Sequence, residues 1–193
     1  MIEDIHRLFA DSARVTAETG QRLAGRIAQA VGMIVDCYRA GGGVFLFGNG
    51  GSAADAQHIA GELVGRFLKE RRPLKAQALT TDPSVLTCLG NDYGFEHIFA
   101  RPLVANASAG DVAVALSTSG NAPNVVAALR EARRLGLGTI ALTGDGGGAC
   151  AEVADVLLDV PETLTPRIQE AHTVIYHVIC ELVESAVAEA PAN

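Results

Sequence analysis

The sequence predicts an α/β protein with one open, doubly wound parallel sheet. Three observations indicate this class: short apolar runs, helical stretches between most of them, and small polar residues directly after the first and third runs. The chain has 193 residues, 49% hydrophobic and 19% charged, which suits one domain with a sizeable core. Ligands of such folds bind at the carboxyl ends of the strands, so the residues after each run are the candidates for function.

The expected elements form a single domain over residues 1–193. Residues 3–40 are predicted as two helices broken near Gly20, the second with an apolar stripe at steps of three and four. That stripe consists of Leu23, Ile27, Ala30, Ile34 and Tyr38. This stripe and the apolar helix expected at about 165–188 together exceed what one sheet can cover, so we expect both to pack between subunits.

The sheet core is expected over about 43–160. Its strands are predicted at 44–47, 76–79, 112–116, 139–142 and 156–160. The helices between them are predicted at 53–68, 83–89, 122–135 and 149–153. Asp82 followed by Pro83 is typical of an N-cap with proline in the first turn. One long helix is expected at about 165–188.

The net charge and the hydropathy argue against nucleic acid and membranes as partners. Fifteen Lys and Arg against 22 Asp and Glu give a net charge of −7, which provides no large attraction for nucleic acid or an anionic membrane. No apolar run approaches the roughly 20 residues of a membrane span. The N-terminus lacks a basic segment followed by an apolar one, so we expect a cytoplasmic protein. The four cysteines are far apart and are expected to be reduced, mostly buried thiols.

Two loops rich in small residues follow the first and third strands. Gly48–Ser52 precedes a helix and fits either an anion-binding loop or a tight turn with Ser52 as the N-cap. It matches neither a dinucleotide-binding nor a Walker motif. Ser117, Thr118 and Ser119 offer three hydroxyls before the next helix, although a simple polar turn is the alternative. Two such loops on one sheet favour phosphate binding.

The helices that follow contain candidates for acid/base or metal chemistry. His58 and Glu62 are four residues apart and therefore share one helix face. The C-terminal helix contains Gln169, His172 and His177. Taken alone, a histidine on an apolar helix is more often a hydrogen-bonded core residue, and a glutamate more often a solvated one, than a functional group. Gln169 and His177 lie about 12 Å apart along the helix, so a single site and sites in different subunits both stay open.

Five groups of residues, in this order along the chain, match one known family. They are Gly48–His58 with Glu62, Thr80–Asp82, Asn91–Asp92, Ser117–Asn121, and Arg167–Glu170 with His172 and His177. These groups resemble the phosphoheptose isomerases, sugar-isomerase (SIS) domain proteins that convert sedoheptulose 7-phosphate into D-glycero-D-manno-heptose 7-phosphate. The resemblance runs from about Ile2 to Ala188. It implies a single flavodoxin-like SIS domain, terminal helices that pack between subunits, a homotetramer, and active sites at subunit interfaces.

The resemblance also implies roles for individual residues. Glu62 resembles the catalytic base, which would move a proton between C1 and C2 through an enediol, and His177 resembles its acid/base partner. One zinc ion per subunit is implied, at positions matching His58, Glu62, Gln169 and His177. The phosphorylated seven-carbon sugar is implied to contact Asn49, Gly50, Gly51, Ser52, Glu62, Asn91, Asp92, Ser117, Thr118, Ser119 and Gln169. Ala122 departs from many members, which have serine there and thus one more hydroxyl contact.

Two alternatives remain beside this isomerase. Some related proteins are non-catalytic regulators that bind a replication initiator or sense phosphosugars, and the initiator-binding ones lack the Glu and His pair. Glu62 and His177 are both present here, which favours an enzyme. An isomerase for another phosphosugar is the second alternative. Neither the pathway that uses the product nor a requirement for zinc follows from the sequence.

Overall fold

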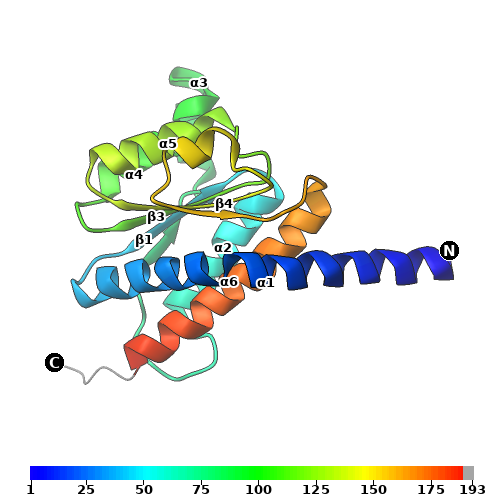
Figure 1. Cartoon of the computed structure of the whole chain (residues 1–193). Coiled ribbons are helices and arrows are strands. Elements are labelled where there is room, and N and C mark those ends of the chain that lie inside the picture. Colours follow the sequence, from blue (N-terminus) through cyan, green and yellow to red (C-terminus); the bar gives the residue numbers. More distant parts are fainter. Residues whose placement is uncertain (189–193) are drawn as a thin grey trace.

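The computed structural model describes residues 1–188 and has the predicted α/β architecture. Five parallel strands form one sheet in the order β2-β1-β3-β4-β5, the flavodoxin-like order (Figure 1). The strands are β1 (Val44–Gly48), β2 (Ala76–Ala78), β3 (Val112–Ser117), β4 (Gly138–Thr143) and β5 (Val156–Asp159). Each predicted strand end is within one residue of the observed one, because short apolar runs bounded by turn residues leave little choice of register.

Helices cover both faces of the sheet. They are α1 (Ile2–Arg39), α2 (Gly51–Val64), α3 (Pro83–Asp92), α4 (Ala100–Asn106), α5 (Pro123–Arg134) and α6 (Thr165–Ala188), with 3₁₀ turns η1 (Phe95–His97) and η2 (Gly148–Glu152). Figure 1 shows α1, α2 and α6 on one face and α3, α4 and α5 on the other. Alternate residues of each strand serve the two layers: Leu46 and Val114 pack toward α1, α2 and α6, whereas Phe47 and Ala115 pack toward α4 and α5.

The first helix corrects two sequence predictions. Residues 2–39 form one continuous helix rather than two helices broken near Gly20. A glycine inside a helix costs about 1 kcal/mol relative to alanine, which the packing of α1 against α6 and the sheet offsets. The stripe from Leu23 to Tyr38 is buried by the chain itself, so the expectation that these residues need a second subunit was wrong.

The N-terminal part of α1 is different. It projects beyond the body of the domain (Figure 1). Met1, Ile2, Ile5, Leu8 and Phe9 on this arm are exposed. On α1, the apolar surface available to another molecule therefore lies before the predicted stripe and not within it.

Other element boundaries depend on distant contacts. The helix predicted at 53–68 runs from Gly51 to Val64, because the backbone N–H groups just beyond it bond to Glu184 of α6 instead. The predicted N-cap is confirmed: Asp82 Oδ1 accepts a hydrogen bond from the Val85 N–H at 3.0 Å. The short helix α4 was missed by the sequence analysis. Among residues 1–188, no helix is both long and apolar enough to cross a membrane.

Candidate active site

The helices α2 and α6 bring three predicted site residues together. His58 and Glu62 lie one turn apart on α2, and His58 Nε2 is 3.0 Å from Glu62 Oε1. His177 approaches from α6, with its Nε2 3.5 Å from His58 Nε2. One ligand atom of each residue lies within 4.8 Å of the others. We call this group the His58–Glu62–His177 cluster; it contains three of the four positions at which the family resemblance implies zinc.

The cluster is reachable from solvent. The side chain of His58 is 44% exposed and that of Glu62 is 23% exposed. His177 is half-buried and packs edge-on against the His58 ring. A carboxylate and two imidazoles in this partly desolvated setting can exchange protons with a bound molecule.

Tyr176 orients the His58 ring from behind. Its buried hydroxyl lies 3.1 Å from His58 Nδ1 and 3.4 Å from Asp55 Oδ1. Burial raises the pKa of Asp55, with the hydrogen bond from Tyr176 acting in the opposite direction. When Tyr176 donates to Asp55, His58 Nδ1–H donates to Tyr176, which leaves Nε2 facing Glu62 Oε1. An imidazole nitrogen and a carboxylate oxygen at 3.0 Å then need a proton or a cation between them.

The cluster fits a zinc ion. Tetrahedral zinc, with bonds of about 2.0–2.1 Å, holds its ligand atoms about 3.3 Å apart. The separations of 3.0 and 3.5 Å in the cluster bracket that value. Two nitrogens and one oxygen form a donor set typical of catalytic zinc, which keeps a fourth position for water or substrate. His58, Glu62 and His177 could therefore hold the metal.

Gln169, the fourth predicted metal ligand, lies elsewhere on α6. Its carboxamide packs against the first turn of α2, where a Cβ added to Gly51 would fall 2.5 Å from Gln169 Nε2. Gly51 precedes His58 by seven residues, or about 10 Å along the helix. Glycine at position 51 thus makes room for Gln169 beside the Gly48–Ser52 loop, while the other three candidates meet further along α2.

The two loops follow the carboxyl ends of the adjacent parallel strands β1 and β3. Gly48 of β1 pairs with Leu116 of β3, so the segments that follow them are neighbours. Asn49 of the first loop and Asn124 in the first turn of α5 join these segments by two reciprocal amide hydrogen bonds of 2.9 and 2.8 Å. Gly50 has φ of 57°, which few other residues adopt, and it is the N-cap of α2. Ser52 is buried inside the first helical turn, so the alternative in which Ser52 is the N-cap was wrong.

The hydroxyls after β3 differ in exposure. Ser117 is buried, Thr118 is half-buried and Ser119 is exposed. Ser119 Oγ accepts a hydrogen bond from the Asn121 N–H at 3.2 Å. Ala122 is the N-cap of α5 and supplies no side-chain cap. Backbone N–H groups at this helix start are therefore directed toward the loop.

Asn91 and Asp92 end α3, in the layer across the sheet from α6 (Figure 1). Both are exposed, and Asn91 Nδ2 donates a hydrogen bond to Asp92 Oδ1 at 2.7 Å. Within one chain they do not join the His58–Glu62–His177 cluster.

His172 is a core residue. It is fully buried, and its Nε2–H donates a hydrogen bond to the Thr143 carbonyl at 3.0 Å. Burial lowers the pKa of His172 to about 4, although the bond to Thr143 opposes this. The ring is therefore neutral at pH 7 and supports the packing of α6 on β4.

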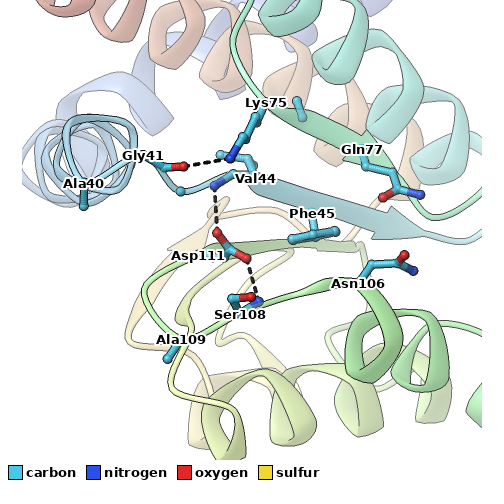
Figure 2. A pocket seen from close by; sticks show the side chains of 13 residues that line it. Ala40, Gly41, Val44, Phe45, Lys75, Gln77, Asn106, Ser108, Ala109 and Asp111 are labelled. Atoms are coloured by element: carbon cyan, nitrogen blue, oxygen red, sulfur yellow. Dashed lines mark hydrogen bonds between the residues drawn. The ribbon is translucent and has the colours of Figure 1, made fainter. Parts of the chain in front are cut away.

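A cavity of about 630 Å³ lies at the other edge of the sheet, where β1, β2 and β3 begin (Figure 2). Its charged groups are already bonded to the backbone. Asp111 accepts hydrogen bonds from the N–H groups of Gly43 and Ser108 at 2.8 and 2.7 Å. Lys75 Nζ donates to the Gly41 carbonyl at 3.0 Å. The two charged side chains that line the cavity are thus already bonded to the backbone.

Comparison with known proteins shows the family and the fold of this chain. The SIS domain family matches residues 8–144. A phosphoheptose isomerase of Aquifex aeolicus is 53% identical over 189 residues, which cover 98% of this chain and 99% of that protein. The chain belongs to the phosphoheptose isomerase family of SIS domain proteins.

Solved structures of this family have the same fold. A phosphoheptose isomerase from Neisseria gonorrhoeae is 44% identical, with a TM-score of 0.90 over 95% of this chain and 98% of that chain. Another, from Francisella tularensis, is 36% identical, with a TM-score of 0.90 over 96% of this chain and 98% of that chain. The likeness to the family in sequence and fold therefore extends over nearly the whole chain.

Sequence reasoning missed several residues around the site of this SIS domain. Tyr176 and Asn124 lie outside the motifs of the sequence analysis, and Asp55 lies within Gly48–His58 but had no role assigned to it. Each acts through a contact with a distant segment. The position of Tyr176 directly before His177 was the one available signal, since a tyrosine inside an apolar helix needs a partner for its hydroxyl.

Proposed function

We propose that this protein is a phosphoheptose isomerase that converts sedoheptulose 7-phosphate into D-glycero-D-manno-heptose 7-phosphate for the synthesis of activated heptose. The observation that carries the proposal is the carboxylate of Glu62 beside two imidazoles, 3.0 Å from His58 Nε2 and in one group with His177. The names and near-complete coverage of the relatives support the same activity.

Aldose–ketose isomerisation needs a base at the carbons and an acid at the oxygens. Glu62 takes the proton from C1 of the ketose and returns it to C2 of the enediol. His177 moves the proton between the two substrate oxygens. Zinc, when bound by His58, Glu62 and His177, supplies polarisation of a substrate oxygen. Glu62 has two carboxylate oxygens, so one can face His58 while the other accepts the proton.

The phosphate and sugar hydroxyls bind at the two loops. The start of α2 after Asn49 and the start of α5 after Ala122 direct backbone N–H groups toward this edge of the sheet. Ser52 and Ser117–Ser119 add hydroxyls there. Gln169 borders the first of these loops, which supports a substrate contact for its carboxamide.

A homotetramer with sites at subunit interfaces fits the exposed surfaces. The arm of α1 presents Ile5 and Phe9, and the outer face of α6 presents Val174, Val178 and Leu182. Asn91 and Asp92 lie across the sheet from the cluster, which supports their joining the site of another subunit. The cytoplasmic location expected from the N-terminal sequence stays a prediction.

Proton exchange tests the activity directly. Purified protein is incubated with sedoheptulose 7-phosphate in D₂O, and NMR follows loss of the C1 proton and formation of the aldose. We expect both signals for the parent and neither for folded His177→Asn, while His97→Asn, which changes a histidine outside the cluster, behaves as the parent. Metal analysis and turnover before and after chelation test zinc.

Absence of exchange in folded, metal-replete parent would favour the regulator. Exchange with a different phosphosugar alone would favour the other isomerase.

A further inference from the structure

A buried carboxylate on α6 accepts hydrogen bonds from backbone N–H groups of the loop that follows α2. Glu184 is 1% exposed. Its Oε1 accepts a hydrogen bond from the Phe67 N–H at 2.8 Å, and its Oε2 accepts from the N–H groups of Leu68 and Lys69 at 2.6 and 2.8 Å. Burial alone would raise the pKa of Glu184, but these bonds outweigh it and hold the pKa below its usual range. The side chain is therefore an ionised anchor for three consecutive amides.

Arg71 completes this anchor and reaches back to α2. Its Nε lies 3.2 Å from Glu184 Oε1, and the side chains of Arg71 and Glu184 are 3% and 2% exposed. Its Nη2 donates to the Glu62 carbonyl at 2.8 Å, and its Nη1 donates to the Gly65 carbonyl at 3.0 Å. The last carbonyls of α2, including that of Glu62 itself, are thus held by a guanidinium.

The same anchor extends to His177. Glu184 follows His177 by seven residues, or two turns, so both lie on one side of α6. The ring of Phe67, whose N–H bonds to Glu184, packs against the His177 ring with centroids 5.6 Å apart. One ion pair therefore contacts the backbone of Glu62 on one side and the residue that packs on His177 on the other.

A contribution to stability does not by itself explain why Arg71 and Glu184 form a buried ion pair. Taking two charges out of water is costly, and well-packed apolar residues of similar volume often stabilise a fold as much or more. A fixed geometry is what the ion pair adds, because its hydrogen bonds are directional whereas apolar packing is not.

We propose that Glu184 and Arg71 are positioning residues for the isomerisation, which set the distance between Glu62 and His177 by fixing the end of α2 and the Phe67 loop on α6. This rests on the proposed function, since it assigns the pair to the same proton transfers. Both residues act through others and touch no reacting atom.

The variant Glu184→Gln tests this, with Glu181→Gln as the matched control because Glu181 is an exposed glutamate on the same helix. We expect kcat to fall by about 10- to 100-fold, since a shift of about 1 Å at reacting groups costs up to that much. KM should change less than about threefold, because the loops after β1 and β3 are untouched. The control should keep both constants.

A second measurement separates positioning from simple loss of folded protein. NMR of ¹³C-labelled histidine reports the ring current of Phe67 at His177. We expect the His177 signal of folded Glu184→Gln to move and that of Glu181→Gln to stay. Unchanged kcat per folded chain, or an unchanged His177 signal, would overturn the proposal.

Phe67→Leu decides the matter if Glu184→Gln does not fold. It keeps both charges and removes the ring, and we expect the same fall in kcat with KM retained. Parent-like kcat in this variant would overturn the proposal. A parent protein inactive on the phosphosugar would instead count against the proposed function, and the His177 signal would still report whether Glu184 positions the ring.

Discussion

The His58–Glu62–His177 cluster and the cavity at the amino ends of the strands are two polar regions with opposite character. The cavity is large, about 630 Å³, and contains Asp111 and Lys75. Yet both carboxylate oxygens of Asp111 and the ammonium of Lys75 bond to the backbone. The cluster occupies little space, but its carboxylate and imidazoles face one another rather than the backbone.

This contrast teaches that titratable groups without backbone bonds, and not cavity volume, indicate the reactive region. Asp111 stabilises the start of β1 and the turn before β3 through its two backbone hydrogen bonds, so its role is structural. Glu62 and His177 make no such backbone bonds among the described residues, so their side chains remain available to a substrate or a metal. Substituting both regions in the same way is the direct test.

Glu62→Gln should have the largest effect. The amide keeps the shape and hydrogen-bonding capacity of the carboxylate but cannot accept the proton. General base catalysis contributes about 10²–10⁴-fold, so we expect kcat to fall by at least that range with little change in melting temperature. Steady-state kinetics, melting curves and metal analysis on one preparation check this. A folded, metal-replete variant with parent kcat would remove Glu62 from the mechanism.

Asn124→Ala should have a smaller effect, on substrate binding. It leaves the Asn49 amide without the two bonds that orient it, at 2.9 and 2.8 Å. An unsatisfied or misdirected polar group costs about 1–3 kcal/mol, so we expect KM for the phosphosugar to rise about 10-fold. Asn106→Ala, beside the cavity, is the control and should keep the parent KM. Equal KM values for both variants would show that the amide pair does not serve the substrate.

His172→Gln should change the pH dependence of stability. The folded pKa of His172 is about 4, below the unfolded value of about 6.5. As the pH falls from 6.5 toward 4, His172 is protonated in the unfolded chain but stays neutral in the folded chain, so the parent loses stability. This loss is about 2 kcal/mol at pH 5 and should be absent from the variant. Urea unfolding at pH 7 and pH 5 measures it, with His6→Gln, an exposed site, as the control; equal pH dependence in parent and His172→Gln would contradict the buried neutral state.

Asp111→Asn should have the smallest effect and none on chemistry. It makes the same acid-to-amide change as Glu62→Gln, at the cavity. One of the two backbone bonds is lost, and water can reach the open cavity, so we expect about 1 kcal/mol less stability. Parent kcat and KM complete the contrast with Glu62→Gln. A substantial fall in kcat would mean that the two regions are coupled.

Local pattern was sufficient for the sheet, the N-cap of α3 and part of the site. Apolar runs indicated all five strands to within one residue, and Asp82-Pro83 indicated a helix start. The spacing of His58 and Glu62 predicted a shared helix face, since four residues make about one turn. These features depend on neighbours in the chain, which periodicity reports.

Tertiary structure alone decided the rest. The meeting of His177 with His58, the burial of the α1 stripe by α6 and the early end of α2 all involve segments more than 100 residues apart. Gly20 stays helical because packing outweighs its weak helix propensity. Arg71 and Glu184 show the same principle: each is an ordinary charged residue in the sequence, and only burial against a distant partner makes the pair an anchor.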